Sequence, residues 1–123
     1  MDTREKIIPL ERVVACARGA AVVTGYFDVL AAEHVRQLER ARRDTGLVVV
    51  LFDPPAPVLA ARARAEMVAA LRVVDYVVIA EEPGPATQRL LEELEPAAIV
   101  RLEAEHARQS DELIAHVRQR HTS

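Results

Sequence analysis

Four short apolar runs dominate the pattern of hydrophobic and polar positions along the chain. Each run is continuous rather than alternating, which is typical of strands that are buried on both faces of a parallel sheet. The four predicted strands are Ala20–Tyr26, Leu47–Phe52, Asp75–Ala80 and Ala97–Leu102. They are too short to be confused with the longer apolar stretches that cross membranes.

The segments between these runs have the period of amphipathic helices. One apolar helix face comprises Leu30, His34, Val35, Leu38 and Ala41, and a second comprises Val58, Leu59, Ala63, Val68 and Leu71. Leu90, Leu91 and Leu94 indicate a third helix, residues 8–17 a leading helix and residues 103–120 a closing one. A helix followed by four strand–helix units predicts one doubly wound, Rossmann-like α/β domain over residues 1–123, with about four parallel strands.

Composition narrows the classes of function. A chain of 123 residues, 50% apolar and 28% charged, suits one soluble domain. Its net charge of −3 gives no general attraction to nucleic acid or to anionic membranes. The single cysteine, Cys16, excludes an internal disulfide, and we expect its thiol to be buried. The charged N-terminus lacks the apolar core of a signal peptide, so we expect a cytoplasmic protein without a membrane partner.

The end of the first predicted strand carries the most suggestive chemistry. Thr24-Gly25-Tyr26-Phe27-Asp28 lies where a strand passes into a helix. Ligands of open α/β sheets bind at the carboxyl ends of strands, and a helix start offers free N–H groups to phosphate. Gly25 would allow the backbone to approach a ligand closely. His106 and His116 are ten residues apart and do not share a helix face, so no metal site is expected in the last helix.

The stretch GYFDVLAAEHVRQLERAR resembles the signature of the cytidylyltransferase-like nucleotidyltransferases, Gly-x-Phe-Asp-x-Leu-His-x-Gly-His-x-x-x-Leu. The positions in register are Gly25, Phe27, Asp28, Leu30, His34 and Leu38. ARAEMVAALRVVDYVVI resembles the helix and third strand of the same family. KIIPLERV and EPAAIVRL resemble parts of the cytidylyltransferase domain of bacterial heptose-phosphate enzymes. The resemblance covers residues 6–102.

The resemblance implies an enzyme that joins a nucleoside triphosphate to a phosphorylated sugar or alcohol and releases pyrophosphate. It implies CTP or ATP as the nucleotide, Mg²⁺ as its companion, and a homodimer. His34 matches the second histidine of the signature and is the expected catalytic residue. The expected nucleotide-binding residues are Gly25, Tyr26, Phe27, Asp28, His34, Asp53, Arg64 and Arg101. No metal site formed by the protein alone is expected.

Two departures from the signature weaken this expectation. Ala31 replaces the first histidine and offers no hydrogen bond to a phosphate, and loss of one such donor typically costs about 10²–10³ in rate. Glu33 replaces the glycine and places a carboxylate in the first turn of the helix, where it would repel a triphosphate. After the fourth strand, only Arg101 keeps the basic character of the family's Lys-Gly-x-Asp loop.

Three hypotheses remain open at this point. The leading one is a degenerate nucleotidyltransferase, weak or inactive, that is retained as a nucleotide-binding or interaction module. The second is an active transferase in which His34 and a basic residue such as Arg64 or Arg101 stabilise the transferring phosphoryl group. The third is a homo-oligomeric assembly protein that binds no nucleotide. For Arg64 and His34 individually, purely structural roles are equally compatible with the sequence.

Overall fold

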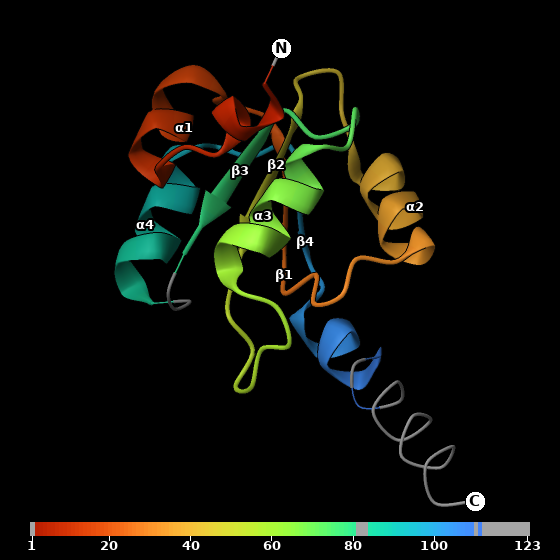
Figure 1. Cartoon of the computed structure of the whole chain (residues 1–123). Coiled ribbons are helices and arrows are strands. Elements are labelled where there is room, and N and C mark those ends of the chain that lie inside the picture. The colour runs from red at the N-terminus through yellow and green to blue at the C-terminus, as the bar shows by residue number, and fades with distance from the viewer. Residues whose placement is uncertain (1, 81–83, 110, 112–123) are drawn as a thin grey trace, which may run out of the picture.

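The computed structural model describes residues 2–80, 84–109 and 111. Its four strands are β1 (Ala21–Gly25), β2 (Leu47–Leu51), β3 (Tyr76–Ile79) and β4 (Ile99–Arg101), all parallel in the order β3-β2-β1-β4. Its helices are η1 (Thr3–Lys6), α1 (Leu10–Cys16), α2 (Ala32–Ala41), α3 (Ala61–Ala69) and α4 (Pro85–Glu93), followed by a helical segment at 103–109. The predicted doubly wound α/β domain is confirmed (Figure 1).

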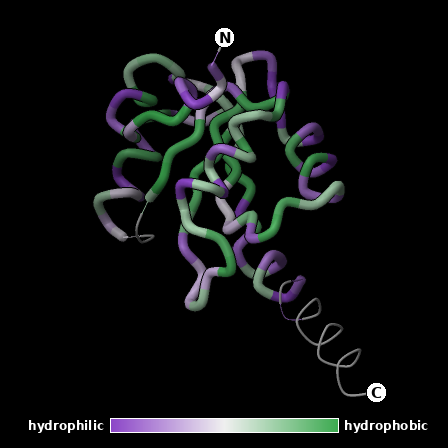
Figure 2. Tube along the Cα trace, viewed as in Figure 1, coloured by the Kyte–Doolittle hydropathy of each residue, from purple (hydrophilic) through white to green (hydrophobic). Residues whose placement is uncertain are grey.

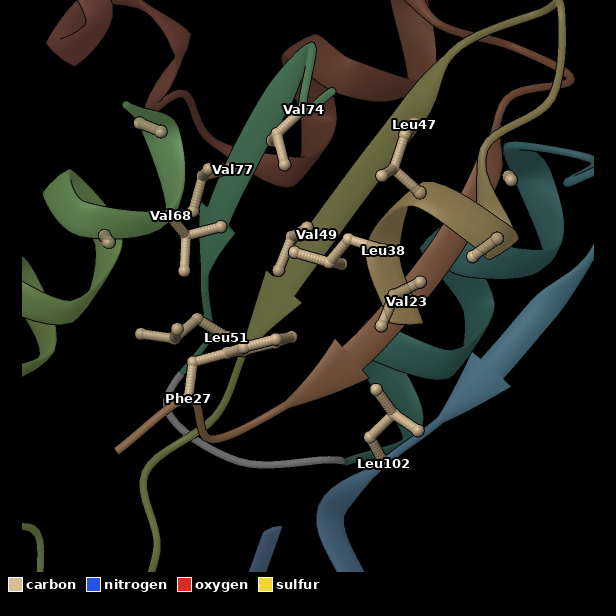
Figure 3. Close-up of a cluster of buried hydrophobic side chains, with 14 residues drawn as sticks. Val23, Phe27, Leu38, Leu47, Val49, Leu51, Val68, Val74, Val77 and Leu102 are labelled. Atoms are coloured by element: carbon tan, nitrogen blue, oxygen red, sulfur yellow. The ribbon is translucent and has the colours of Figure 1, made fainter. Parts of the chain in front are cut away.

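The sheet is covered on both faces, which explains the continuous apolar runs. Every residue of β1 and β2 is buried. One core cluster packs α2 and α3 against the sheet and includes Val49, Leu38 and Val68 (Figure 3). The other packs α1 and α4 against the opposite face. In Figure 2 the hydrophobic colour accordingly concentrates along the strands, with polar colour on the outer turns of the helices.

The predicted burial of the fourth apolar run is wrong, because its strand β4 lies at the edge of the sheet. All three of its residues are exposed, including Ile99 and Val100, each 37% exposed. Its only strand partner among the described residues is β1. The chain then crosses the carboxyl edge of the sheet, where segment 103–109 lies beside the turn that leaves β1 (Figure 1).

Two predictions about local structure are wrong. Helix α3 begins at Ala61, so Val58 and Leu59 lie in the preceding loop, and the Val58 side chain is 64% exposed. The carboxylate of Asp28 accepts hydrogen bonds from the backbone N–H groups of both residues, at 2.7 and 2.9 Å, and so fixes them outside the helix. Cys16 is exposed rather than buried, because it ends α1 on the outer side.

One buried cation ties the carboxyl ends of β1 and β2 together. Arg64 on α3 is completely buried. Its guanidinium donates to the carbonyl oxygens of Tyr26, Phe52 and Leu59, each at 3.0 Å, and forms an ion pair with Asp53. These carbonyls lie in the loops after β1 and β2 and before α3, and carbonyls that are shielded from water need a donor. Arg64 therefore sets the shape of the loops at this edge.

We expect Arg64→Met to lower the free energy of unfolding by about 3 kcal/mol or more, because three buried or partly buried carbonyls lose a donor and Asp53 loses its ion-pair partner. Urea denaturation would measure this. Arg62→Met on the same helix is the matched control: Arg62 forms only an exposed pair with Glu66 at 3.3 Å, and its loss should cost under ~0.5 kcal/mol. Equal stability of the two variants would contradict the role of Arg64 as a clamp.

Candidate functional site

The candidate site is a cavity of about 300 Å³ at the carboxyl edge of the sheet. The turn after β1, the first turn of α2 and segment 103–109 line it, with Ala31, Glu33, His34, His106 and Gln109 among the lining residues. A larger cavity of about 600 Å³ lies at the amino edge of the strands. We favour the smaller one because ligands of parallel α/β sheets bind at the carboxyl edge, beside helix starts.

The predicted catalytic histidine is fully engaged by its own chain. His34 is buried at the third position of α2, and its Nδ1 accepts the backbone N–H of Ala31 at 2.9 Å. Because a backbone N–H can only donate, Nδ1 carries no proton and Nε2 does. The Nε2–H then donates to Oε1 of Gln109 at 2.8 Å. The N-cap residue of α2 is Ala31, which has no capping side chain, and the His34 side chain instead accepts the N–H of this N-cap residue.

A second imidazole, His106, reaches the same place from the far end of the chain. It is 2% exposed, and its Nδ1 accepts the backbone N–H groups of Tyr26 at 3.0 Å and Phe27 at 3.3 Å. The ring centroids of His34 and His106 are 4.6 Å apart, and each ring also makes an edge contact with Phe27. The N–H groups of Tyr26 and Phe27 thus both donate to the His106 side chain.

Gly25 makes room for this imidazole. A Cβ on Gly25 would lie 2.5 Å from Cε1 and 2.6 Å from Nδ1 of His106, closer than real contacts allow. The close approach that the sequence predicted for a ligand is therefore made by His106. The next residue but one, Phe27, has the left-handed φ of 48°, uncommon for a non-glycine residue, and its completely buried side chain holds it there.

Glu33 carries its charge away from the helix start. Its carboxylate pairs with Arg36 at 2.9 Å and with Arg40 at 3.1 Å, both on the outer side of α2. The hydrogen bonds from these two arginines lower the pKa of Glu33. The repulsion of a phosphate that the sequence predicted is thus reduced by two adjacent cations. No intramolecular partner among the described residues takes the N–H groups of Ala32 and Glu33.

Of the remaining predicted residues, Asp28 lines this cavity, whereas Asp53, Arg64 and Arg101 do not. The carboxylate of Asp28 holds the loop at Val58 and Leu59. Asp53 and Arg64 form the ion pair that ties the loops after β1 and β2. Arg101 is exposed at the end of β4 and donates to Gln88 at 3.3 Å. Their roles as nucleotide contacts stay predictions. His116 and most of the predicted helix 103–120 lie outside the described residues.

Sequence reasoning missed His106 and Gln109. His106 lies 80 residues from Tyr26, and its spacing to other histidines gave no signal. The usable signal was its place shortly after the fourth strand, because the carboxyl ends of parallel strands meet at one edge of the sheet. In the part of the chain that the structure describes, no three His, Cys, Asp or Glu side chains form a candidate metal site, and no helix is long and apolar enough to cross a membrane.

Comparisons with known proteins show one family that the sequence resembles. The cytidylyltransferase-like family matches residues 22–120. The "Bifunctional protein HldE" of Geobacter sulfurreducens is 34% identical over 113 residues, which are 82% of this chain and 22% of that protein. Its namesakes from Syntrophotalea carbinolica and Helicobacter pylori are 35% and 30% identical over 68% and 81% of this chain, and 19% and 24% of those proteins. The chain thus spans about a fifth of the length of these relatives.

We expect Gly25→Ala to destabilise the domain by about 1–3 kcal/mol, because the added methyl group forces the buried His106 ring from its place. Thermal and urea unfolding would measure the loss. Gly84→Ala is the matched control, since a Cβ there meets nothing within 4 Å, and it should cost under ~1 kcal/mol. Equal losses would show that the ring does not need the space at Gly25.

The stability of the domain should fall in mildly acidic solution because of His106. Burial, and secondarily the nearby His34, lower the pKa of His106 from 6.5 to about 4. The unfolded chain therefore binds this proton at a higher pH than the folded chain. The resulting stability is complete above pH 6.5 and is lost as the pH falls from 6.5 towards 4, by up to about 3 kcal/mol.

Urea denaturation of the wild type and of His106→Asn at pH 7.5 and pH 4.5 would check this. The wild type should lose more stability than the variant between the two pH values, because Asn cannot be protonated. Parallel losses in both proteins would contradict the assignment to His106.

Proposed function

Because the chain belongs to the cytidylyltransferase-like family, we propose that it binds a nucleotide, CTP or ATP, at the start of α2 and transfers nucleotidyl groups weakly or not at all. The observation that carries this proposal is the engagement of His34. Its Nδ1 caps α2 and its Nε2–H donates to Gln109, while Ala31 offers no imidazole. The signature therefore supplies no free ring nitrogen to a transferring phosphoryl group.

Three features support retained binding of phosphate. The cavity opens at the start of a ten-residue helix, where the dipole favours an anion. The N–H groups of Ala32 and Glu33 have no partner among the described residues. Glu33, the one carboxylate of this helix turn, is paired with two arginines. Binding needs these donors alone, whereas rate acceleration needs donors placed at the charge that develops during transfer.

Mg²⁺ would accompany the triphosphate rather than occupy a cage made by the protein. Mg²⁺ is usually held by one or two carboxylates together with substrate phosphates. Asp28 is the cavity carboxylate nearest to this description, but both its oxygens already accept backbone N–H groups. The described residues therefore fit a metal carried mainly by the nucleotide. The chain's part is to position the phosphates.

One contact also favours the active transferase as a second candidate. The proton of His34 is on Nε2 and faces Gln109, a side chain of segment 103–109. Displacement of that amide by a phosphate oxygen would turn the same N–H towards a ligand without a change of tautomer. For either function, we retain the homodimer as a prediction and place its contact at the exposed edge of β4.

Isothermal titration calorimetry with CTP and with ATP, each with Mg²⁺, tests binding, and pyrophosphate release with a panel of sugar and alcohol phosphates tests transfer. We expect micromolar binding of one nucleotide. The rate of pyrophosphate release should lie far below the ~1–10³ s⁻¹ that is typical of enzymes. Gln109→Ala should raise any residual release because it frees the Nε2–H of His34. Glu92→Ala, at an exposed position on α4, is the control and should change nothing.

Two results would contradict the proposal in different ways. Turnover by the wild type within the enzymatic range would establish the active transferase. Absence of heat with either nucleotide, from protein shown to be folded, would overturn nucleotide binding and favour the assembly protein.

A further inference from the structure

One ring nitrogen at the candidate site has no partner. Among the described residues, three buried side-chain atoms lack a hydrogen bond: Oγ1 of Thr24, Oε1 of Gln37 and Nε2 of His106. Of these three residues, His106 alone lines the cavity at the start of α2. A buried donor without an acceptor typically costs about 1–3 kcal/mol, so its persistence calls for an explanation.

The orientation of this imidazole is fixed by the backbone. Two N–H groups, of Tyr26 and Phe27, point at Nδ1, so that nitrogen must accept and the proton must sit on Nε2. A flip of the ring would put a carbon atom against both amides. The space at Gly25 and the edge contact with Phe27 at 4.5 Å hold the ring in place. The Nε2–H thus projects from the side of the ring turned away from these amides.

The same contacts make the Nε2–H a stronger donor. Chains of hydrogen bonds polarise one another, and two amides that donate to Nδ1 withdraw electron density from the ring. The loop amides thereby make the N–H bond at Nε2 more polar. His34 cannot play this part while both its nitrogens are engaged by Ala31 and Gln109.

We propose that the Nε2–H of His106 donates a hydrogen bond to a phosphoryl oxygen of the nucleotide at the start of α2, in place of the imidazole that Ala31 lacks. This role rests on the nucleotide binding proposed above, and it names His106 as the residue that positions the phosphate. Two hydrogen bonds beside His106 hold segment 103–109 against α2. His34 donates to Gln109 at 2.8 Å, and Gln37 donates to Glu105 at 3.0 Å. Burial lowers the pKa of His106, so the group acts as a neutral donor at neutral pH.

Two substitutions separate the two ring nitrogens. His106→Asn keeps an acceptor oxygen at the place of Nδ1, so it preserves the contact with the loop amides but removes the donor at Nε2. His106→Gln can place an amide N–H near Nε2 but removes the acceptor for Tyr26 and Phe27. Arg108→Asn, at an exposed position of the same segment, controls for the effect of asparagine on the helical turn.

The experiment measures the affinity of the full chain for CTP and ATP by calorimetry, with urea denaturation of each variant to establish folding. We expect His106→Asn to weaken binding by about ten- to a hundredfold, the size of one hydrogen bond to a charged group. We expect Arg108→Asn to bind as the wild type does, and His106→Gln to keep more affinity than His106→Asn per folded molecule. Wild-type affinity in folded His106→Asn would overturn the role of His106 while nucleotide binding stands.

A second readout keeps the two proposals apart. The ¹⁵N resonance of the His106 ring is followed by NMR while inorganic phosphate, or the nucleotide, is added to the wild type. A shift of Nε2 larger than that of Nδ1 is expected. If calorimetry finds no nucleotide binding but phosphate shifts Nε2, the donor role stands and the nucleotide proposal fails. If neither ligand shifts Nε2, the donor role is overturned as well.

Discussion

The structure depends on how the backbone is satisfied where β1 ends. The chain turns sharply at Tyr26 and Phe27 inside the domain, and buried backbone N–H and C=O groups need partners. His106 accepts the two N–H groups, and Arg64 donates to the carbonyl oxygen of Tyr26. One partner comes from α3 and the other from the segment after β4. Two segments that are distant in the sequence, α3 and residues 103–109, therefore both contact this one turn.

The fold follows from local patterns, and the sequence accordingly predicted it. The runs of the two central strands, such as residues 47–52, are buried on both faces as the pattern predicted, whereas the fourth run forms the exposed edge strand β4. The start of α3 could not be predicted in this way. Its position is decided by the carboxylate of Asp28, which lies 30 residues before Val58 and holds the loop out of the helix. Exposure of Cys16 likewise depends on how the end of α1 packs, which periodicity does not reveal.

The candidate site was predictable in place but not in composition. Gly25 and His34 lie where the sequence placed them, at the carboxyl edge of the sheet. Their partners could not be deduced, because His106 and Gln109 come from a segment about 75–80 residues away. The same partners change the meaning of each residue. Gly25 admits an imidazole of its own chain, and Glu33 is turned towards two arginines, so the expected repulsion of phosphate loses much of its basis.

The charges at the start of α2 argue for holding a phosphate rather than transferring one. Glu33 pairs with Arg36 and Arg40, the nearest cations on that helix. The cavity is lined by the start of α2, by the neutral ring of His106, and by the carboxylates of Asp28 and Glu33, each of which already accepts hydrogen bonds from its own chain. Fixed dipoles attract an anion in a sheltered site, but they accelerate transfer only where they point at the charge that develops in the transition state. If a phosphate binds here as proposed, the two replacements in the signature would act in the same direction. Ala31 would take one hydrogen-bond donor from the reacting group, and Glu33 would keep Arg36 and Arg40 paired, while the helix start and His106 would remain to hold the phosphate.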